Sequence, residues 1–260
     1  MFLPALVLLL AATGLGWLLA RQDSPASRDL AREMRTAQAL LTAREALIGF
    51  AATYRNNEHP NADFGYLPCP DLDGDGSSET CGSKDQTSVG RLPYLTLNLP
   101  DLRDGAGECL WYAVSGSFKN NPKADTLNWD STGKLRLLDA NGLPLMLPGD
   151  EAGLAAAIVI AAGPPRPGQE RSAGPERCGG DAEARNIAQY IEALGNRADN
   201  ELIDVRAPAG NDRIVTITTG DIYRQLKRRA SYAPWLQRVF QANADCLAKP
   251  VLPAVVAPER

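Results

Sequence analysis

The sequence has very little histidine, because His59 is the only one among its 260 residues. Zinc centres built on several histidines are therefore excluded, and any site that needs a histidine base depends on one residue in a polar loop. An excess of positive charge is also missing, since the formal net charge is −4. A general nucleic-acid binder needs a basic surface to displace counterions, so we expect no nucleic-acid partner.

Motifs of the common enzyme classes are absent as well. The chain contains no G-x-S-x-G, G-x-x-x-x-G-K-[ST], G-x-G-x-x-G or H-E-x-x-H. No C-x-x-C occurs among its five cysteines, which excludes zinc ribbons and thioredoxin-like redox sites. The remaining enzymatic hypothesis is a pair of carboxylates brought together by the fold, which a sequence does not reveal. We expect no catalytic residues and a non-enzymatic function.

An apolar run without charged residues extends over 2–20, and Thr13 is its only polar side chain. A helix of this length spans roughly 28 Å, close to the hydrocarbon thickness of a bilayer. The run therefore predicts a transmembrane anchor over 1–22. The alternative is a cleaved signal peptide, but no basic region precedes the run and no A-x-A-like site follows it.

The orientation of this anchor depends on two opposing signals. Arg21, Arg28, Arg32 and Arg35 follow the apolar run, and the positive-inside rule would place the body in the cytoplasm. Widely spaced cysteines in loops rich in Gly and Pro favour disulfides in an oxidising compartment instead. We expect the exported arrangement, which is a single-pass inner-membrane protein with its head in the periplasm.

The rest of the chain divides into three parts. Residues 23–57 start at Ser24-Pro25 and carry apolar side chains at helical spacing, which predicts an amphipathic helix with one apolar stripe on a folded head. Residues 58–248 predict an α+β head, and 249–260 form a Pro-rich tail. The predicted strands are 64–68, 109–114, 134–138, 143–147, 155–161 and 213–218, and the predicted helices are 181–194 and 221–247, the second broken or kinked at Pro234.

The segment 71–76, DLDGDG, has the opening pattern of an EF-hand-type calcium loop. Alternate carboxylates bring hard oxygen ligands to one point, and the final glycine permits a sharp turn. The twelfth position is Gly82, where the bidentate glutamate is needed, and Glu79 at the ninth position could partly substitute. Two interpretations stay open, a solvated acidic turn or a calcium site. The candidate calcium ligands are Asp71, Asp73, Asp75 and Glu79.

Cys69 and Cys81 bracket this acidic turn. A disulfide between them would close a small loop and contribute about 3 kcal/mol in the chain-entropy description. It would also fix the shape of the turn, with or without a metal ion. Sequence does not choose among the arrangements in which four of five cysteines pair, so this pairing is a prediction.

Seven segments occur in an order that is characteristic of one family. They are 43–51 (AREALIGFA), 65–71 (GYLPCPD), 90–93 (GRLP), 107–114 (GECLWYAV), 157–162 (AIVIAA), 168–171 (GQER) and 211–213 (NDR). Together they resemble the type IV pilin-like proteins, in particular the pseudopilins of type II secretion. The resemblance covers residues 1–230, and REALIGFA and LPCPD are its most specific parts.

The resemblance implies a pilin-like α+β fold, in which a long N-terminal helix lies half in lipid and half on an antiparallel sheet, with further C-terminal helices. Apolar helix halves of many copies then bundle into a filament core, and the subunit performs no catalysis. Some members bind calcium near the sheet edge. Family members carry a basic leader and a glutamate four residues after the first phenylalanine. This sequence has Leu6 at that distance from Phe2 and no leader, which puts polymerisation in doubt.

The expected function is therefore that of a minor pseudopilin in a type IV pilus or a type II secretion-type assembly. Its partners would be the inner membrane and other pilin-like subunits or assembly proteins. The alternative is an anchored periplasmic module that binds calcium or another ligand and does not polymerise.

Overall fold

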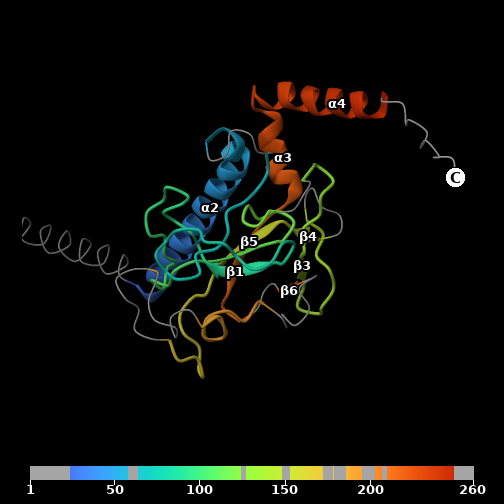
Figure 1. The fold of residues 1–260 in the computed structure, drawn as a ribbon. Helices are drawn as coiled ribbons and strands as arrows, with labels where there is room; N and C mark the ends of the chain where they lie inside the picture. The colour runs from blue at the N-terminus through green and yellow to red at the C-terminus, as the bar shows by residue number, and fades with distance from the viewer. Residues whose placement is uncertain are drawn as a thin grey trace, which may run out of the picture.

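The structure is a computed structural model that describes residues 24–57, 64–123, 127–147, 153–171, 178, 186–194, 203–206 and 210–248. Within them, a long helix packs on a four-stranded sheet, a three-stranded sheet lies beside the first, and two helices follow near the C-terminus (Figure 1). The predicted anchor at 1–22, the tail at 249–260 and His59 lie outside the described residues.

The long helix, α2 (Pro25–Asn57), begins where the sequence predicts. The Ser24 Oγ accepts a hydrogen bond from the backbone N–H of Ser27 at 3.2 Å, and proline at the first helical position has a pre-set φ. The second half of the helix turns a buried face toward the sheet, with Leu47 and Tyr54 among the core side chains. Burial of this face, more than intrinsic helix propensity, stabilises α2.

A four-stranded antiparallel sheet, in the order β1-β2-β5-β7, carries the core. Its strands are β1 (Ser88–Arg91), β2 (Trp111–Val114), β5 (Ala157–Ala161) and β7 (Arg213–Ile217). The strand β5 is buried along its whole length, as its unbroken apolar sequence predicts. Its alternate side chains contribute to two cores, the one under α2 (Ala157, Val159, Ala161) and the one on the opposite face (Ile158, Ile160).

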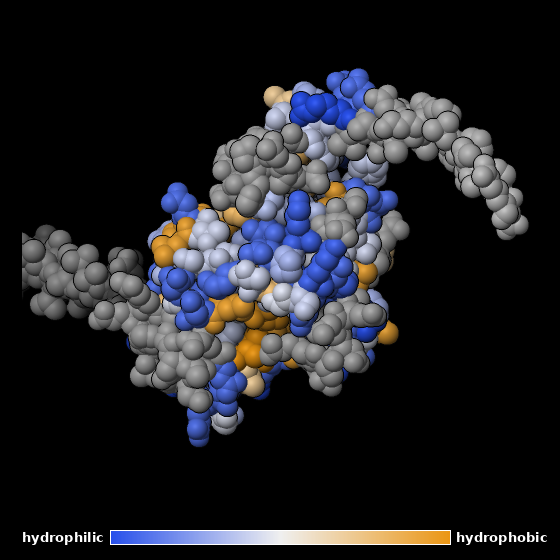
Figure 2. All heavy atoms as spheres, in the orientation of Figure 1, coloured by the Kyte–Doolittle hydropathy of each residue, from blue (hydrophilic) through white to orange (hydrophobic). Residues whose placement is uncertain are grey.

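The second sheet has the order β4-β3-β6 and borders the core opposite α2. It consists of β3 (Leu135–Leu138), β4 (Leu154–Ala155) and β6 (Ile203–Arg206), and β6 runs parallel to β3. A short 3₁₀-helix, η1 (Ile187–Gln189), packs beside this core. On the face shown in Figure 2, hydrophilic side chains are spread over the described surface, and apolar ones gather near its centre.

Two helices follow β7, namely α3 (Thr219–Lys227) and α4 (Tyr232–Ala248). Thr218 caps α3 in a capping box with Asp221, as the sequence predicts. The break between the helices precedes Pro234, which lies in the first turn of α4. A proline is tolerated there because that N–H has no partner inside the helix. The predicted break at Pro234 is therefore corrected, and Figure 1 shows α4 extending away from the body.

The predicted fold class included a membrane-spanning half-helix, and the predicted location was the inner membrane. Both predictions are corrected. Over the ranges that the structure describes, no helix combines the length and the apolar character that crossing a bilayer requires. The helix α2 is long, but Arg28, Asp29, Arg32 and Glu33 lie in its first turns, and charged side chains are costly in hydrocarbon. The described residues show an α+β arrangement of helix, antiparallel sheet and C-terminal helices.

Three predicted elements also differ from the structure. The segments 64–68 and 143–147 form only isolated bridges, from Leu67 to Lys119 and from Pro144 to Leu138. Proline lacks the N–H that a ladder needs, which explains why neither segment extends into a strand. The predicted helix 181–194 is described from residue 186, and there it forms only η1.

Candidate functional site

The acidic turn, residues 71–79, brings the predicted calcium ligands together. One oxygen of each carboxylate lies within 4.8 Å of the others in the set Asp71, Asp73, Asp75 and Glu79. Asp71 is buried and forms the floor of the turn, because its Oδ1 accepts the Gly74 N–H at 2.6 Å and its Oδ2 accepts the Gly76 N–H at 2.8 Å. Gly76 has a φ of +90°, and a Cβ there would lie 2.6 Å from the Tyr94 ring, so only glycine fits.

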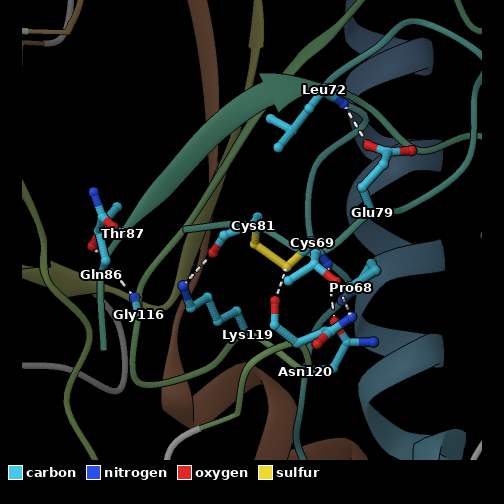
Figure 3. The surroundings of a disulfide bond; sticks show 12 residues. Pro68, Cys69, Leu72, Glu79, Cys81, Gln86, Thr87, Gly116, Lys119 and Asn120 are labelled. Carbon is cyan, nitrogen blue, oxygen red and sulfur yellow. Dashed lines mark hydrogen bonds between the residues drawn. A yellow bond between two sulfur atoms is a disulfide. The ribbon is translucent and has the colours of Figure 1, made fainter. Parts of the chain in front are cut away.

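The other three carboxylates accept hydrogen bonds from the same turn. The Asp75 N–H donates to Asp73 Oδ1 at 3.1 Å, and the Ser77 N–H donates to Asp75 Oδ1 at 2.6 Å. Glu79 reaches back across the turn and accepts the Leu72 N–H at 2.6 Å (Figure 3). The turn is therefore held by side-chain to backbone bonds between residues close in sequence, which is why the spacing alone could predict it.

Electrostatic repulsion within the acidic turn favours a bound cation. Burial raises the pKa of Asp71, backbone hydrogen bonds oppose that shift, and the charges of Asp75 and Asp73 add to it. Burial also raises the pKa of Glu79, and the charges of the neighbouring aspartates act in the same direction. A divalent cation would remove this repulsion, and carboxylate oxygens are the ligands that Ca²⁺ prefers.

A disulfide joins Cys69 to Cys81 at the base of the acidic turn, with a Cα–Cα distance of 5.8 Å (Figure 3). The buried Lys119 donates from its Nζ to the carbonyl oxygens of Cys81 and Ser83. On the other side of the bridge, the Cys69 N–H donates to Asn120 Oδ1 at 3.1 Å. Lys119 and Asn120 thus fix both ends of the turn to one segment of the body.

A second disulfide joins Cys109 to Cys178, with a Cα–Cα distance of 5.4 Å. A carboxylate oxygen of Asp101 lies within 4.8 Å of both sulfur atoms, which places three potential metal-ligating groups together. The sulfur atoms of a disulfide are not thiolates, and a thiolate is the form that binds metal ions. This cluster is therefore a covalent cross-link and not a metal centre.

Three large apolar side chains lie exposed along α2 and are called the outer stripe here: Leu30, Met34 and Leu41. Their relative exposures are 63%, 64% and 50%. The sequence analysis predicts that the apolar stripe of this helix lies on the head. The structure shows that the second half of α2 does so, whereas the outer stripe faces away from the sheet. Exposed apolar side chains in a row along a helix indicate a contact surface.

A hollow of about 410 Å³ lies between the first half of α2 and the loops at one end of the sheet. Its α2 wall includes Asp29 and Glu33, a carboxylate pair of the kind that the enzymatic hypothesis requires. Each of these acids is already paired, Asp29 with Arg32 at 3.6 Å and Glu33 with Arg213 at 3.1 Å. Both carboxylates of this hollow therefore lie in ion pairs with arginine side chains.

Sequence reasoning missed two buried polar clusters, because their members lie far apart in the chain. In the first, the Arg91 guanidinium carbon lies 3.9 Å from the ring centroid of Trp111 and 4.5 Å from that of Tyr190. Arg91 also donates to the carbonyl of Cys109 at 3.0 Å, and burial lowers its pKa to about 10. The second cluster centres on Asp212, which is buried directly before β7.

No protein-family model, no curated protein and no solved structure matches the chain. The pilin-like resemblance therefore stays a prediction, and a proposed function has to rest on the residues and contacts described above.

Proposed function

We propose that this chain is a non-enzymatic, pilin-like structural subunit that works through protein–protein contacts made by the outer stripe of α2. The exposure of Leu30, Met34 and Leu41 is the observation that carries the proposal. Burying such side chains contributes about 1.5–3 kcal/mol each, so this stripe is the largest source of association energy along α2.

The spacing of the outer stripe fits packing against another helix. With the exposed Ala37 included, the apolar positions are separated by four, three and four residues, which is the a/d spacing of a coiled-coil seam. Such a seam takes the side chains of a second helix between its own. A second copy of this chain offers the same seam, so a helix pair along α2 is the contact that we propose.

The test compares variants that remove apolar side chains from different surfaces. Leu30→Gln combined with Met34→Gln should abolish concentration-dependent self-association in sedimentation velocity, because the seam loses two of its three large apolar side chains. Leu143→Gln combined with Met146→Gln is the matched control, since these side chains are also exposed, at 63% and 76%, but lie outside α2. This control should associate like the wild type.

Two results would contradict the proposed contact. One is a wild-type chain that stays monomeric at every concentration reached. The other is a control variant that loses association to the same degree as the α2 variant, because exposed apolar area in general would then explain the self-association.

A second candidate function is calcium binding, and the convergence of four carboxylates in the acidic turn favours it. Asp73 and Asp75 are exposed and would meet the ion first, while Asp71 and Glu79 would supply oxygens from the floor of the turn. The disulfide at Cys69–Cys81 would keep these oxygens in place before binding, which reduces the ordering that binding requires.

Calcium binding predicts a thermal shift that depends on the acidic turn. At a calcium concentration of 100 times Kd, the gain in unfolding free energy is about 2.7 kcal/mol. Asp73→Asn combined with Asp75→Asn should remove this gain, whereas Asp130→Asn, an exposed aspartate in another turn, should keep it. Equal melting temperatures of the wild type in calcium chloride and in EDTA would exclude the site.

A further inference from the structure

Asp212 lies directly before β7 and is only 2% exposed. Its Oδ2 accepts two backbone hydrogen bonds, from Glu192 N–H and Ala193 N–H, each at 2.8 Å. Its Oδ1 is buried and has no hydrogen-bond donor in the part of the chain that the structure describes. A carboxylate oxygen enclosed in this way would carry negative charge that neither water nor a donor stabilises.

Asp212 has a second negative charge nearby, and the cation that acts on it is also bound to other groups. Glu192 lies next to it, and the Oε2 of Glu192 is also buried, with the Arg166 Nη1 at 3.5 Å. Arg171 is a cation whose charge acts on Asp212, but it is engaged with the carbonyl of Gly163 at 2.7 Å and with Glu108 at 3.3 Å. The negative charge of Glu192 disfavours ionisation of the buried Asp212.

Other charged groups near this site have partners outside the Asp212–Glu192 pair. Arg213, the next residue, pairs with Glu33 of α2 at 3.1 Å. Asp104 accepts the Gly163 N–H at 2.9 Å, and Arg91 stacks on Tyr190. The protonation of Asp212 is therefore governed mainly by its burial and by the charges of Glu192 and Arg171.

Two oxygens of this cluster, Asp212 Oδ1 and Glu192 Oε2, are buried without a hydrogen-bond donor in the described part of the chain. Both atoms are closed off from solvent. A methyl group added at Gly210 would lie 2.1 Å from the Glu192 Oε2, so the backbone itself closes over that carboxylate. A calcium ion needs six or more oxygens at 2.3–2.6 Å, and a buried water needs a cavity of its own. The ligand small enough for this site is a proton.

We propose that Asp212 is a proton-operated latch, which holds a proton in the folded chain and ties the segment at Glu192–Ala193 to the start of β7. The proton neutralises the enclosed carboxyl group while its Oδ2 continues to accept both backbone bonds. Loss of the proton leaves two charges against each other and favours opening of the segment. The latch adjoins the hollow beside α2, because Asn211 and Arg213 line that hollow.

The direction of the pH dependence follows from the pKa of Asp212. Burial raises this pKa from 3.8 to about 7, and the charge of Glu192 adds to the shift, while the backbone bonds and Arg171 oppose it. The folded chain therefore binds the proton more tightly than the unfolded chain. Its stabilising effect is complete below the unfolded pKa of 3.8 and is lost as the pH rises from there through the folded pKa of about 7.

The experiment compares urea unfolding of the full chain and of Asp212→Asn from about pH 5 to pH 8. Asparagine keeps an acceptor for the two N–H groups and carries no titratable proton. The ratio of the wild-type unfolding constant to that of Asp212→Asn should rise at least tenfold between pH 5 and pH 7. Asp130→Asn is the matched control and should leave the pH profile of the wild type unchanged, because Asp130 is exposed.

A second variant keeps the proposal testable if Asp212→Asn does not fold. Glu192→Gln removes the neighbouring charge, so the pH-dependent loss of stability should move to lower pH. The hydrogen exchange of the Glu192 and Ala193 amides, corrected for intrinsic rates, should accelerate in the wild type over the same pH range. A constant stability ratio, or amide protection that does not change with pH, would overturn the latch.

Discussion

At the scale of single residues, two glycines show how strongly position decides the effect of one methyl group. Gly49 lies inside α2, and a Cβ there would meet no atom within 4 Å. Gly133 lies against the backbone, where a Cβ would be 1.8 Å from the carbonyl oxygen of Ala155. Gly49→Ala should therefore raise the free energy of unfolding by about 1 kcal/mol, because alanine loses less entropy in a helix.

Gly133→Ala should lower the free energy of unfolding by about 1–3 kcal/mol, because the backbone at Ala155 has to move. Chemical denaturation of both variants measures the two effects. A Gly133→Ala variant as stable as the wild type would show that the backbone there moves freely.

The separation along the chain between contacting residues explains which site residues could be predicted from the sequence. Asp71, Asp73 and Asp75 each accept a hydrogen bond from a backbone N–H two or three positions further along the chain, so their spacing predicts their convergence. Asp212 meets Glu192 across 20 residues, and Arg91 meets Tyr190 across a longer stretch. No local pattern marks such contacts, because the fold alone creates them.

At the scale of elements, the length of a helix or strand decides how well the sequence predicts it. The helix α2 repeats its apolar pattern over many turns, and β5 is an unbroken apolar run, so both were predictable. The strands β1 and β6 have only four residues each, and their sequences SVGR and IDVR contain a glycine or charged residues. Their partners in the sheets hold them, and those partners lie far away in sequence.

The helix α2 also shows what periodicity leaves open. Its pattern shows which side chains are apolar but not which part of the helix has a sheet beneath it. Arg44 marks the part that does, because it donates to the Thr216 carbonyl at 2.9 Å and pairs with Asp221 at 2.8 Å. Leu41 of the outer stripe is exposed although its neighbour Leu40 is buried, so the side of the helix on which a residue lies also decides its exposure.

At the scale of the whole molecule, the two disulfides constrain loops of different length. Cys69 and Cys81 are 12 residues apart, and Cys109 and Cys178 are 69 apart. Chain-entropy reasoning gives contributions of about 3 and about 4 kcal/mol, respectively. Replacing each pair by alanine should therefore destabilise the chain, and the longer loop should show the larger loss in urea denaturation without reductant.

A Cys246→Ser background is the control for this comparison, since it removes the fifth thiol from exchange reactions. The reverse order, with the larger loss at Cys69 and Cys81, would indicate that the short bridge acts mainly by shaping the acidic turn and not by restricting the unfolded chain.

The helix α4 has a mechanical consequence for the molecule. It is held at one end, where Trp235 meets Phe64 edge to face with ring centroids 5.5 Å apart and Tyr232 packs against both rings. From Gln237 to the end of the helix at Ala248, the rise amounts to about 18 Å. A rotation of α4 by about 10° about these rings would move the far end of the helix by about 3 Å. Small rearrangements beneath Phe64 are thus amplified at a distance from the core.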